Sequence, residues 1–136
     1  MRAFLDSNIF IYAAGAENPM KAECVALLER VASGELDATT NAEVIQEIHH
    51  VFRRRGRLAD GITLGREVIR LLPDLLPITR DDVFRSGEIL TARPQISPRD
   101  ALHAAVALNN GITGIVSVDR DFEHIDGIVR LDPAAA

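Results

Sequence analysis

Short apolar runs alternate along this chain with longer segments in which apolar residues recur every three or four positions. The short runs are mostly apolar throughout, which is typical of strands that are covered on both faces. Strands that alternate with helices predict an α/β fold with a mainly parallel sheet flanked by helices. We expect five strands, over residues 3–5, 36–39, 75–78, 115–118 and 128–131.

The longer segments have helical periodicity. Asn41 is a suitable N-cap for the helix expected over 41–55, and Gly56 and Gly111 fit helix ends. Pro73 and Pro77 lack a backbone donor, so we expect them to confine the third strand to the sheet edge. The expected helices span residues 22–32, 41–55, 66–72, 81–93 and 98–110.

The chain has 136 residues, which favours a single domain. We expect this domain to span residues 1–132 and residues 133–136 to form a frayed tail. The single Cys24 cannot form an intrachain disulfide and reads as a small buried hydrophobe. There is no secretion signal and no apolar run near the ~20 residues that cross a bilayer, so we expect a soluble cytoplasmic protein without membrane contact.

The net charge of −5 disfavours a broad, sequence-independent coat of nucleic acid, but it is compatible with a nuclease whose catalytic acids lower the charge. Arg53, Arg54, Arg55 and Arg57 end the helix expected over 41–55. They fit contacts to RNA phosphates or to an acidic partner segment. They equally fit a solvated helix end that is stabilised through the helix dipole.

Two aspartates directly follow apolar strands: Asp6 follows 3–5 and Asp119 follows 115–118. Ligands of open parallel sheets bind outside the carboxyl ends of the strands, so both acids would share one rim if these strands are neighbours. Each has a structural alternative. Asp6 can cap a helix that starts at Ser7, and Asp119 can be a turn residue before Arg120.

Two further acids lie on helices. Glu47 falls at the border of the apolar face of its helix, where a carboxylate can point into a cleft beside the core, and Glu43 is its rival. Asp100 follows Ser97 and Pro98, a pattern typical of a helix start that would explain the acid by capping alone. The helix that follows is apolar almost all round, however, so its start would point inward.

Carboxylates that share one pocket repel each other unless a cation or a proton joins them. A hard divalent ion such as Mg2+ is the usual solution in proteins. The combination of two acids at strand ends and two on helices therefore points to metal-assisted phosphate chemistry.

Four segments resemble the four motifs of PIN-domain ribonucleases, in the family's order and over nearly the whole chain. The size of the chain most resembles the VapC-type toxins of prokaryotic toxin–antitoxin pairs. One position departs from the pattern, because Asn41 stands where the family often has Ser or Thr upstream of Glu47. The segments are Phe4-Leu5-Asp6-Ser7-Asn8, Val44-Ile45-Gln46-Glu47-Ile48, the run from Ser97 to Ala105, and Ser117-Val118-Asp119-Arg120-Asp121-Phe122.

The resemblance implies a single PIN-like domain and an endoribonuclease that leaves a 3′-hydroxyl and a 5′-phosphate. It implies that Asp6, Glu47, Asp100 and Asp119 bind Mg2+ or Mn2+. Polar positions that support such acids are occupied by Ser7, Asn8 and Ser117, and Asp121 stands where some relatives carry an additional acid. The implied partners are an RNA substrate, a cognate antitoxin protein and a second copy of the chain in a homodimer.

Two other functions remain open at this point. A catalytically silent module of the same fold would bind RNA or a partner, although such a module has no need of convergent acids. A Mg-dependent phosphohydrolase of the haloacid-dehalogenase type would need Asp-x-Asp after the first strand, and Asp6-Ser7-Asn8 lacks the second Asp. The four histidines show no metal-binding spacing, so we expect them to be non-catalytic: His49, His50, His103 and His124.

Overall fold

A computed structural model describes all residues from 1 to 136. Four parallel strands form one sheet in the order β2-β1-β3-β4. They are β1 (Ala3–Leu5), β2 (Ala38–Thr39), β3 (Gly114–Val116) and β4 (Val129–Leu131). β1 is central and fully buried, as expected for a parallel strand covered on both faces. The predicted α/β fold with a parallel sheet is confirmed.

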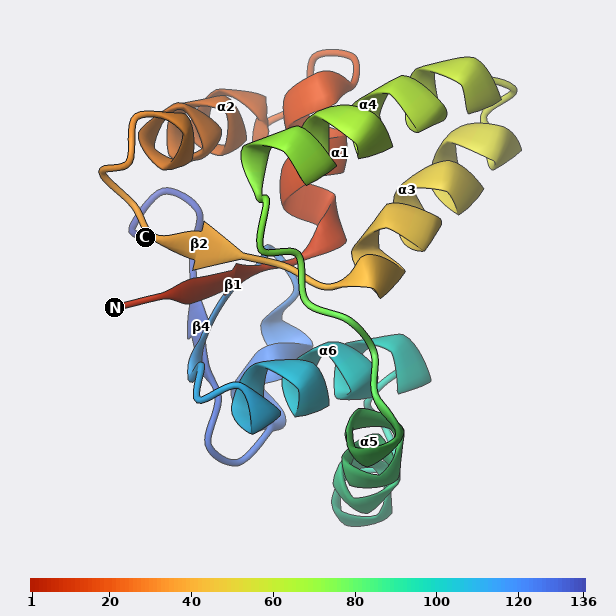
Figure 1. Cartoon of the computed structure of the whole chain (residues 1–136), viewed down its shortest axis with the longest axis vertical. Coiled ribbons are helices and arrows are strands. Elements are labelled where there is room, and N and C mark those ends of the chain that lie inside the picture. The colour runs from red at the N-terminus through yellow and green to blue at the C-terminus, as the bar shows by residue number, and fades with distance from the viewer.

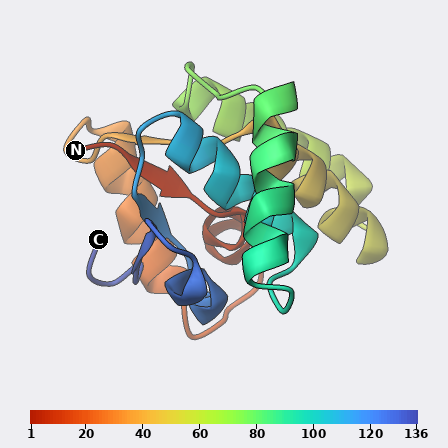
Figure 2. The same ribbon diagram turned by 90° about the horizontal axis from the view of Figure 1, so that it is seen from below.

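Helices cover both faces of this sheet, and both chain termini lie on one side of the molecule (Figures 1 and 2). One face carries α1 (Ser7–Ala14), α2 (Lys21–Ala32), α3 (Ala42–Arg54) and α4 (Leu58–Leu71). The other carries α6 (Pro98–Asn109), with α5 (Arg80–Ala92) packed beside it. A short 3-10 helix, η1 (Arg120–His124), follows β3.

The predicted fifth strand, over 75–78, is wrong. Only Leu76 pairs with the sheet: its N–H donates to Thr40, its carbonyl accepts from Ala42, and a single parallel bridge joins it to Asn41. Pro73 and Pro77 limit the pairing to this one residue, because a proline cannot donate to a ladder. The segment therefore only touches the extension of β2 at the outer edge.

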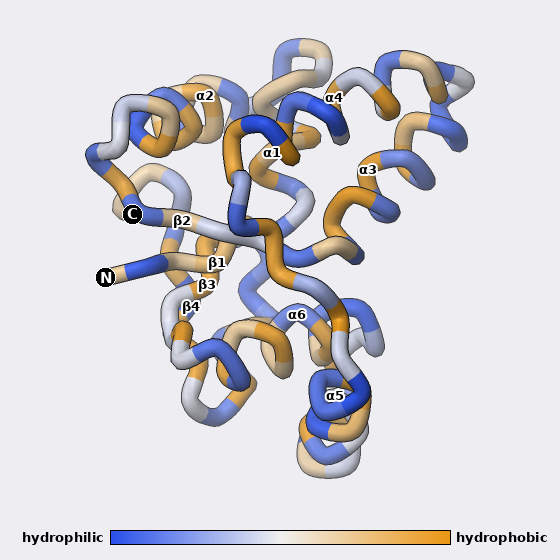
Figure 3. Tube along the Cα trace, viewed as in Figure 1, coloured by the Kyte–Doolittle hydropathy of each residue, from blue (hydrophilic) through white to orange (hydrophobic).

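α4 is twice as long as the helix predicted over 66–72. The part that the prediction missed contains Gly61 and Gly65, whose low helix propensity hides it in the sequence. Both glycines are buried against α3, and a Cβ on Gly61 would lie 2.6 Å from Cβ of Phe52. Close packing of the two helices thus requires glycine there. Figure 3 shows hydrophobic and hydrophilic residues alternating along α3 and α4, as expected for helices with one covered face.

Side-chain caps mark the starts of α3, α5 and α6. Asn41 caps α3 by accepting the Val44 N–H at 3.1 Å, and Ser97 caps α6 by accepting the Asp100 N–H at 3.1 Å. Thr79 and Asp82 form a reciprocal capping box at the start of α5. These caps fix where α3 and α6 start, and both starts lie at the carboxyl edge of the sheet.

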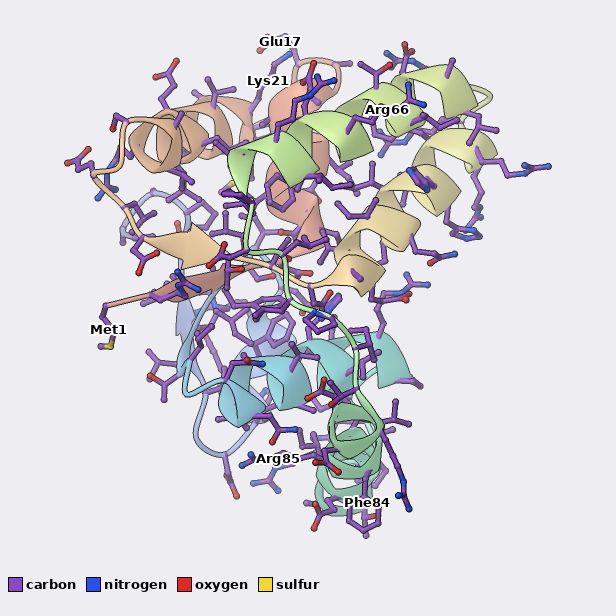
Figure 4. The ribbon with its side chains drawn as sticks, in the orientation of Figure 1. Met1, Glu17, Lys21, Arg66, Phe84 and Arg85 are labelled. Atoms are coloured by element: carbon purple, nitrogen blue, oxygen red, sulfur yellow. The ribbon has the colours of Figure 1, made fainter.

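The core is aliphatic with a few aromatic rings, and Cys24 is buried in it as a free thiol, as predicted. The outer face of α5 is different, because Val83 and Phe84 are exposed there, and Figure 4 shows Phe84 projecting away from the fold. None of the helices has the length and apolar character that crossing a bilayer requires. The tail boundary at residue 132 stays a prediction; Arg30 donates a hydrogen bond to the carbonyl of Ala136.

Candidate active site

Four carboxylates from distant parts of the chain line one cleft at the carboxyl edge of the sheet. The cleft has a volume of about 580 Å³, and no hydrophobic residue lines it. Because β1 and β3 are neighbours, the residues that follow them reach the same rim. The lining residues are Asp6, Ser7, Asn8, Glu47, Ser97, Pro98, Arg99, Asp100 and Asp119.

Asp6 lies at the bottom of this cleft and is only 4% exposed. Its Oδ1 accepts the Ser7 N–H at 2.7 Å, so it is also the N-cap of α1. Its Oδ2 accepts the hydroxyl of Ser117 at 2.7 Å and the amide of Asn8 at 3.2 Å. Burial raises the pKa of Asp6, although nearby His103 and these hydrogen bonds oppose that effect. Asp6 thus both caps α1 and lines the cleft, the two alternatives that its position in the sequence left open.

Glu47 lies beside Asp6 and is 5% exposed. Its Oε2 accepts the Ser7 hydroxyl at 2.8 Å, and its Oε1 pairs with Nε2 of His103. Glu43, by contrast, lies outside the cleft and is only half-buried. The geometry therefore places Glu47, and not Glu43, beside the other acids.

Asp100 and Asp119 lie at the more open side of the cleft. Asp119 caps η1 by accepting the Asp121 N–H at 2.9 Å, and its own N–H donates to Ser117 Oγ at 3.0 Å. Asp121 is exposed, yet one carboxylate oxygen from each of these three aspartates lies within 4.8 Å of the others. The Asp100 carboxylate does not close a reciprocal cap onto Ser97, so capping alone does not explain it.

The electrostatics of Asp100 reflect this crowding. Burial, the charge of Asp6 and the hydrogen bond and charge of Asp119 together raise the pKa of Asp100 to about 7, against the weaker opposing effect of His103. A cation that binds this carboxyl group would displace the proton and leave the group in its charged form. Like-charge repulsion in this cleft is therefore relieved by either a proton or a metal ion.

The donor atoms fit a hard divalent cation. They are carboxylate oxygens, the type of ligand that Mg2+ and Mn2+ prefer. Oδ1 of Asn8 is buried at the cleft and has no hydrogen-bond partner, an unusual state for a buried oxygen that a metal-bound water or an ion would satisfy. The residues present thus fit the metal that the fold implies.

Sequence reasoning missed two side chains of this site. Arg99 lines the cleft, half-exposed, with its Nη1 3.7 Å from Oε2 of Glu47. His103 is fully buried against Glu47 and Phe4. The available signal was a lone histidine in the otherwise apolar run 101–108, because a buried imidazole needs a polar partner.

The four arginines at the end of α3 do not line the cleft. Arg55 and Arg57 lie over the ring of Phe52, with 5.8 Å and 5.7 Å to its centroid, and Arg57 also pairs with Asp60 at 2.9 Å. Arg53 and Arg54 are exposed. A rise of 1.5 Å per residue puts Arg53 about 9 Å along the helix from Glu47.

Comparison with known proteins gives the same class of protein as the fold and the cleft. The family model of the PIN domain matches residues 3–128. Ribonuclease VapC13 of Mycobacterium tuberculosis is 38% identical over 130 residues, which cover 93% of this chain and 97% of that protein. Ribonuclease VapC7 of the same organism is 35% identical over 137 residues, covering 97% and 92%. The chain belongs to the PIN-domain family. Within that family, the similar proteins just described are VapC ribonucleases.

Solved structures agree with this fold. VapC20 of Mycobacterium tuberculosis, described as a toxin that cleaves the sarcin–ricin loop, has a TM-score of 0.75 at 21% identity, over 93% of this chain and 96% of that chain. VapBC2 of Rickettsia felis, bound to a DNA fragment from its promoter, has a TM-score of 0.76 at 19% identity, over 96% and 98%. The resemblance of the four motifs to this family is confirmed.

Proposed function

We propose that this chain is a divalent-metal-dependent endoribonuclease and the toxin of a type II toxin–antitoxin pair. The observation that carries the proposal is the convergence of Asp6, Glu47, Asp100 and Asp119 on one wholly polar cleft, in a chain of the PIN-domain family. The names of its relatives, which are ribonucleases, support the substrate class.

In this proposal Asp6 and Asp119 are direct ligands of Mg2+ or Mn2+, with Asp100 and Glu47 acting directly or through water. Asp121 is a reserve ligand on the exposed side, within 4.8 Å of Asp100 and Asp119. When bound, the ion supplies positive charge that acidifies an attacking water and neutralises the developing charge on the phosphate. Ser7 and Ser117 hold Glu47 and Asp6 in place through short hydrogen bonds.

The reaction is an in-line attack of water on a phosphodiester. The oxygen of the water forms the new bond to phosphorus, and the bond from phosphorus to the 3′ oxygen breaks. A cleft carboxylate accepts the proton of the water, and the departing 3′ oxygen gains a proton. The products are a 5′-phosphate and a 3′-hydroxyl. Arg99 is the only cationic side chain that lines the cleft, and its guanidinium suits a bidentate contact with the scissile phosphate.

Regulation in this proposal comes from a protein partner. Two structural neighbours are described in these terms: a toxin–antitoxin complex from Klebsiella pneumoniae, and VapBC-5 of Mycobacterium tuberculosis, a member of the VapBC family of toxin–antitoxin systems. By analogy, a segment of the antitoxin would occupy the acidic cleft, and Arg53 and Arg54 offer an exposed basic patch for an acidic part of it. Action in the cytoplasm and a homodimeric state complete the proposal.

The decisive experiment compares purified, partner-free wild type with Asp6→Asn and Asp119→Asn on a labelled structured RNA with Mg2+ or Mn2+. Asp126→Asn is the matched control, because it makes the same charge change on a side chain that is 97% exposed and outside the cleft. We expect metal-dependent cutting by wild type and the control, abolished by EDTA and strongly reduced in both cleft variants.

Equal cutting by all four proteins would indicate a contaminant and refute the site. A parallel assay on a small phosphate ester tests the phosphohydrolase alternative, which predicts turnover of the ester and intact RNA. Mg2+ binding by calorimetry, without cleavage of several RNA pools, would favour a silent RNA-binding or partner-binding module instead.

A further inference from the structure

A buried chain of hydrogen bonds links the start of α3 to the cleft. The Asn41 amide lies 3.0 Å from Nδ1 of His103, and Nε2 of the same ring pairs with Oε1 of Glu47. Oε2 of Glu47 in turn accepts the Ser7 hydroxyl at 2.8 Å. Asn41 and His103 are both 0% exposed. Three elements, α1, α3 and α6, therefore meet in one continuous polar network inside an apolar core.

The direction of these hydrogen bonds is fixed by the cap of α3. Oδ1 of Asn41 accepts the Val44 N–H at 3.1 Å, so the NH2 group of the same amide must face His103. An NH2 group only donates, and Nδ1 of His103 must therefore be the unprotonated, accepting nitrogen. The proton of the neutral ring then sits on Nε2 and is donated to Glu47. The ring is fully buried and packs tilted against Phe4, with 5.5 Å between the ring centroids.

This direction also decides what His103 can bind. Oxygens of Asp6 and Glu47 and a ring nitrogen of His103 lie within 4.8 Å of one another, which is a spacing that a metal ion could use. A nitrogen that already carries a proton cannot coordinate an ion. His103 would have to release Asn41 or lose its Nε2 proton to become a ligand, and Asn41 is held by the helix it caps.

We propose that His103 is a positioning residue: Asn41 sets its tautomer, its Nε2–H orients Glu47, and the cation site is thereby left with oxygen ligands only. The inference rests on the proposed function, since it assigns a task within that metal site. Outer residues that orient a ligand and fix its hydrogen bonds commonly change metal affinity by about 10-fold to 100-fold. A site of oxygen atoms favours Mg2+ or Mn2+ over Zn2+, which prefers nitrogen ligands.

The first test reads the tautomer directly by nitrogen NMR of the histidine rings, with and without saturating Mg2+. The chain has four histidines, so the missing signal of His103→Gln assigns the ring. We expect an unprotonated Nδ1 and a protonated Nε2 in wild type, unchanged by Mg2+. A protonated Nδ1 in wild type, or loss of the Nε2 proton on adding Mg2+, would overturn the proposal.

Asn41→Asp is the sharpest variant, because aspartate is an equally good N-cap but can only accept at the position that faces Nδ1. We expect Nδ1 of His103 to become protonated in this variant, with the helix retained by circular dichroism. An unchanged ring spectrum would contradict control of the tautomer by Asn41. This readout needs no nuclease activity, so it stays interpretable if the RNA assay fails.

The second test separates positioning from simple packing. The Nε2 of a glutamine overlaps that of histidine, so His103→Gln keeps a donor for Glu47, whereas His103→Leu fills the space without one. We expect the dissociation constant of Mg2+, measured by calorimetry, to rise at least about 10-fold in His103→Leu and only about 3-fold or less in His103→Gln. Equal losses in both variants, or no loss in His103→Leu, would refute the positioning role. If His103→Leu fails to fold, the NMR spectra of wild type and of Asn41→Asp still test whether Asn41 sets the tautomer of His103.

Discussion

The two halves of the acidic cleft are built differently. Asp6 and Glu47, the buried half, accept hydrogen bonds from protein donors on both oxygens. Asp100 and Asp119, the open half, are half-buried and lie close to one another and to the exposed Asp121. The buried half is thus preorganised by hydrogen-bond donors of the protein, whereas the open half is a set of like charges in need of a counter-ion.

One site thus combines carboxylates in fixed positions with carboxylates that respond to protons and metal ions. A carboxylate held by several donors keeps its position whether or not a cation is present. Carboxylates that repel each other bind protons and metal ions in competition. In the proposed metal site, the buried half would therefore set where a cation sits, and the open half would set the conditions under which it binds.

The largest expected difference between the halves is in catalysis. We expect Asp6→Asn to lower kcat/KM for RNA about 1,000-fold or more and Asp119→Asn about 100-fold. Raising the Mg2+ concentration should partly restore Asp119→Asn, because water can replace a ligand at the open side, whereas Asp6 is almost fully buried and both of its oxygens are held by protein donors. Steady-state cleavage across a Mg2+ titration measures this. Equal recovery of both variants would remove the distinction between the halves.

The next effect is on stability against pH in the metal-free protein. The pKa of Asp100 is about 7 in the folded state, whereas the ordinary pKa of an aspartate, 3.8, applies to the unfolded chain. The folded state therefore binds more protons across this window, so the free energy of unfolding should fall as pH rises from about 4 to about 7. Urea denaturation in EDTA at several pH values measures the slope.

Asp100→Asn is the control for this pH effect, because it removes the titrating group and should flatten the slope in that window. Asp6 contributes to the same slope, since its pKa is raised too, so the flattening is expected to be partial. Saturating Mg2+ should also flatten it. A slope of opposite sign in the wild-type protein would show that the open half is not crowded in solution.

Arg99 comes third, because it lines the cleft half-exposed, with its Nη1 3.7 Å from Oε2 of Glu47. We expect Arg99→Ala to raise KM for RNA about 10-fold, the size of one charge-assisted hydrogen bond. Arg99→Lys should keep part of the affinity, because it keeps the charge without the bidentate geometry. The loss should shrink at high salt. A fall in Mg2+ affinity with unchanged KM would instead assign Arg99 to the organisation of Glu47.

The smallest effects are expected away from the cleft. Arg53→Ala and Arg54→Ala should change the free energy of unfolding by no more than about 0.5 kcal/mol, because both side chains are exposed. We expect them to leave kcat unchanged and to reduce the salt dependence of RNA or antitoxin binding. Binding measured at several salt concentrations checks this. Unchanged salt dependence would make the patch a solvated helix end.

Local sequence patterns predicted most of the fold. The alternation of strands and helices, and the caps at Asn41 and Ser97, correspond to the elements observed. The errors arose where tertiary packing overrides propensity. Residues 75–78 look like a strand but pair through Leu76 alone, and the start of α4 looks weakly helical because its glycines serve contact with α3. For Asp6 and Asp119, capping and lining the cleft turned out to be compatible.

The sequence by itself determined the family, the α/β class and the acids that stand at strand and helix ends, because these depend on local periodicity and motif spacing. Only the tertiary structure decided that Asn41, Glu47 and His103 form one network and that the cleft has a buried half and an open half. Those properties depend on contacts between positions 41, 47 and 103, far apart in the chain, and on how much water each carboxylate loses when the helices and the sheet pack together.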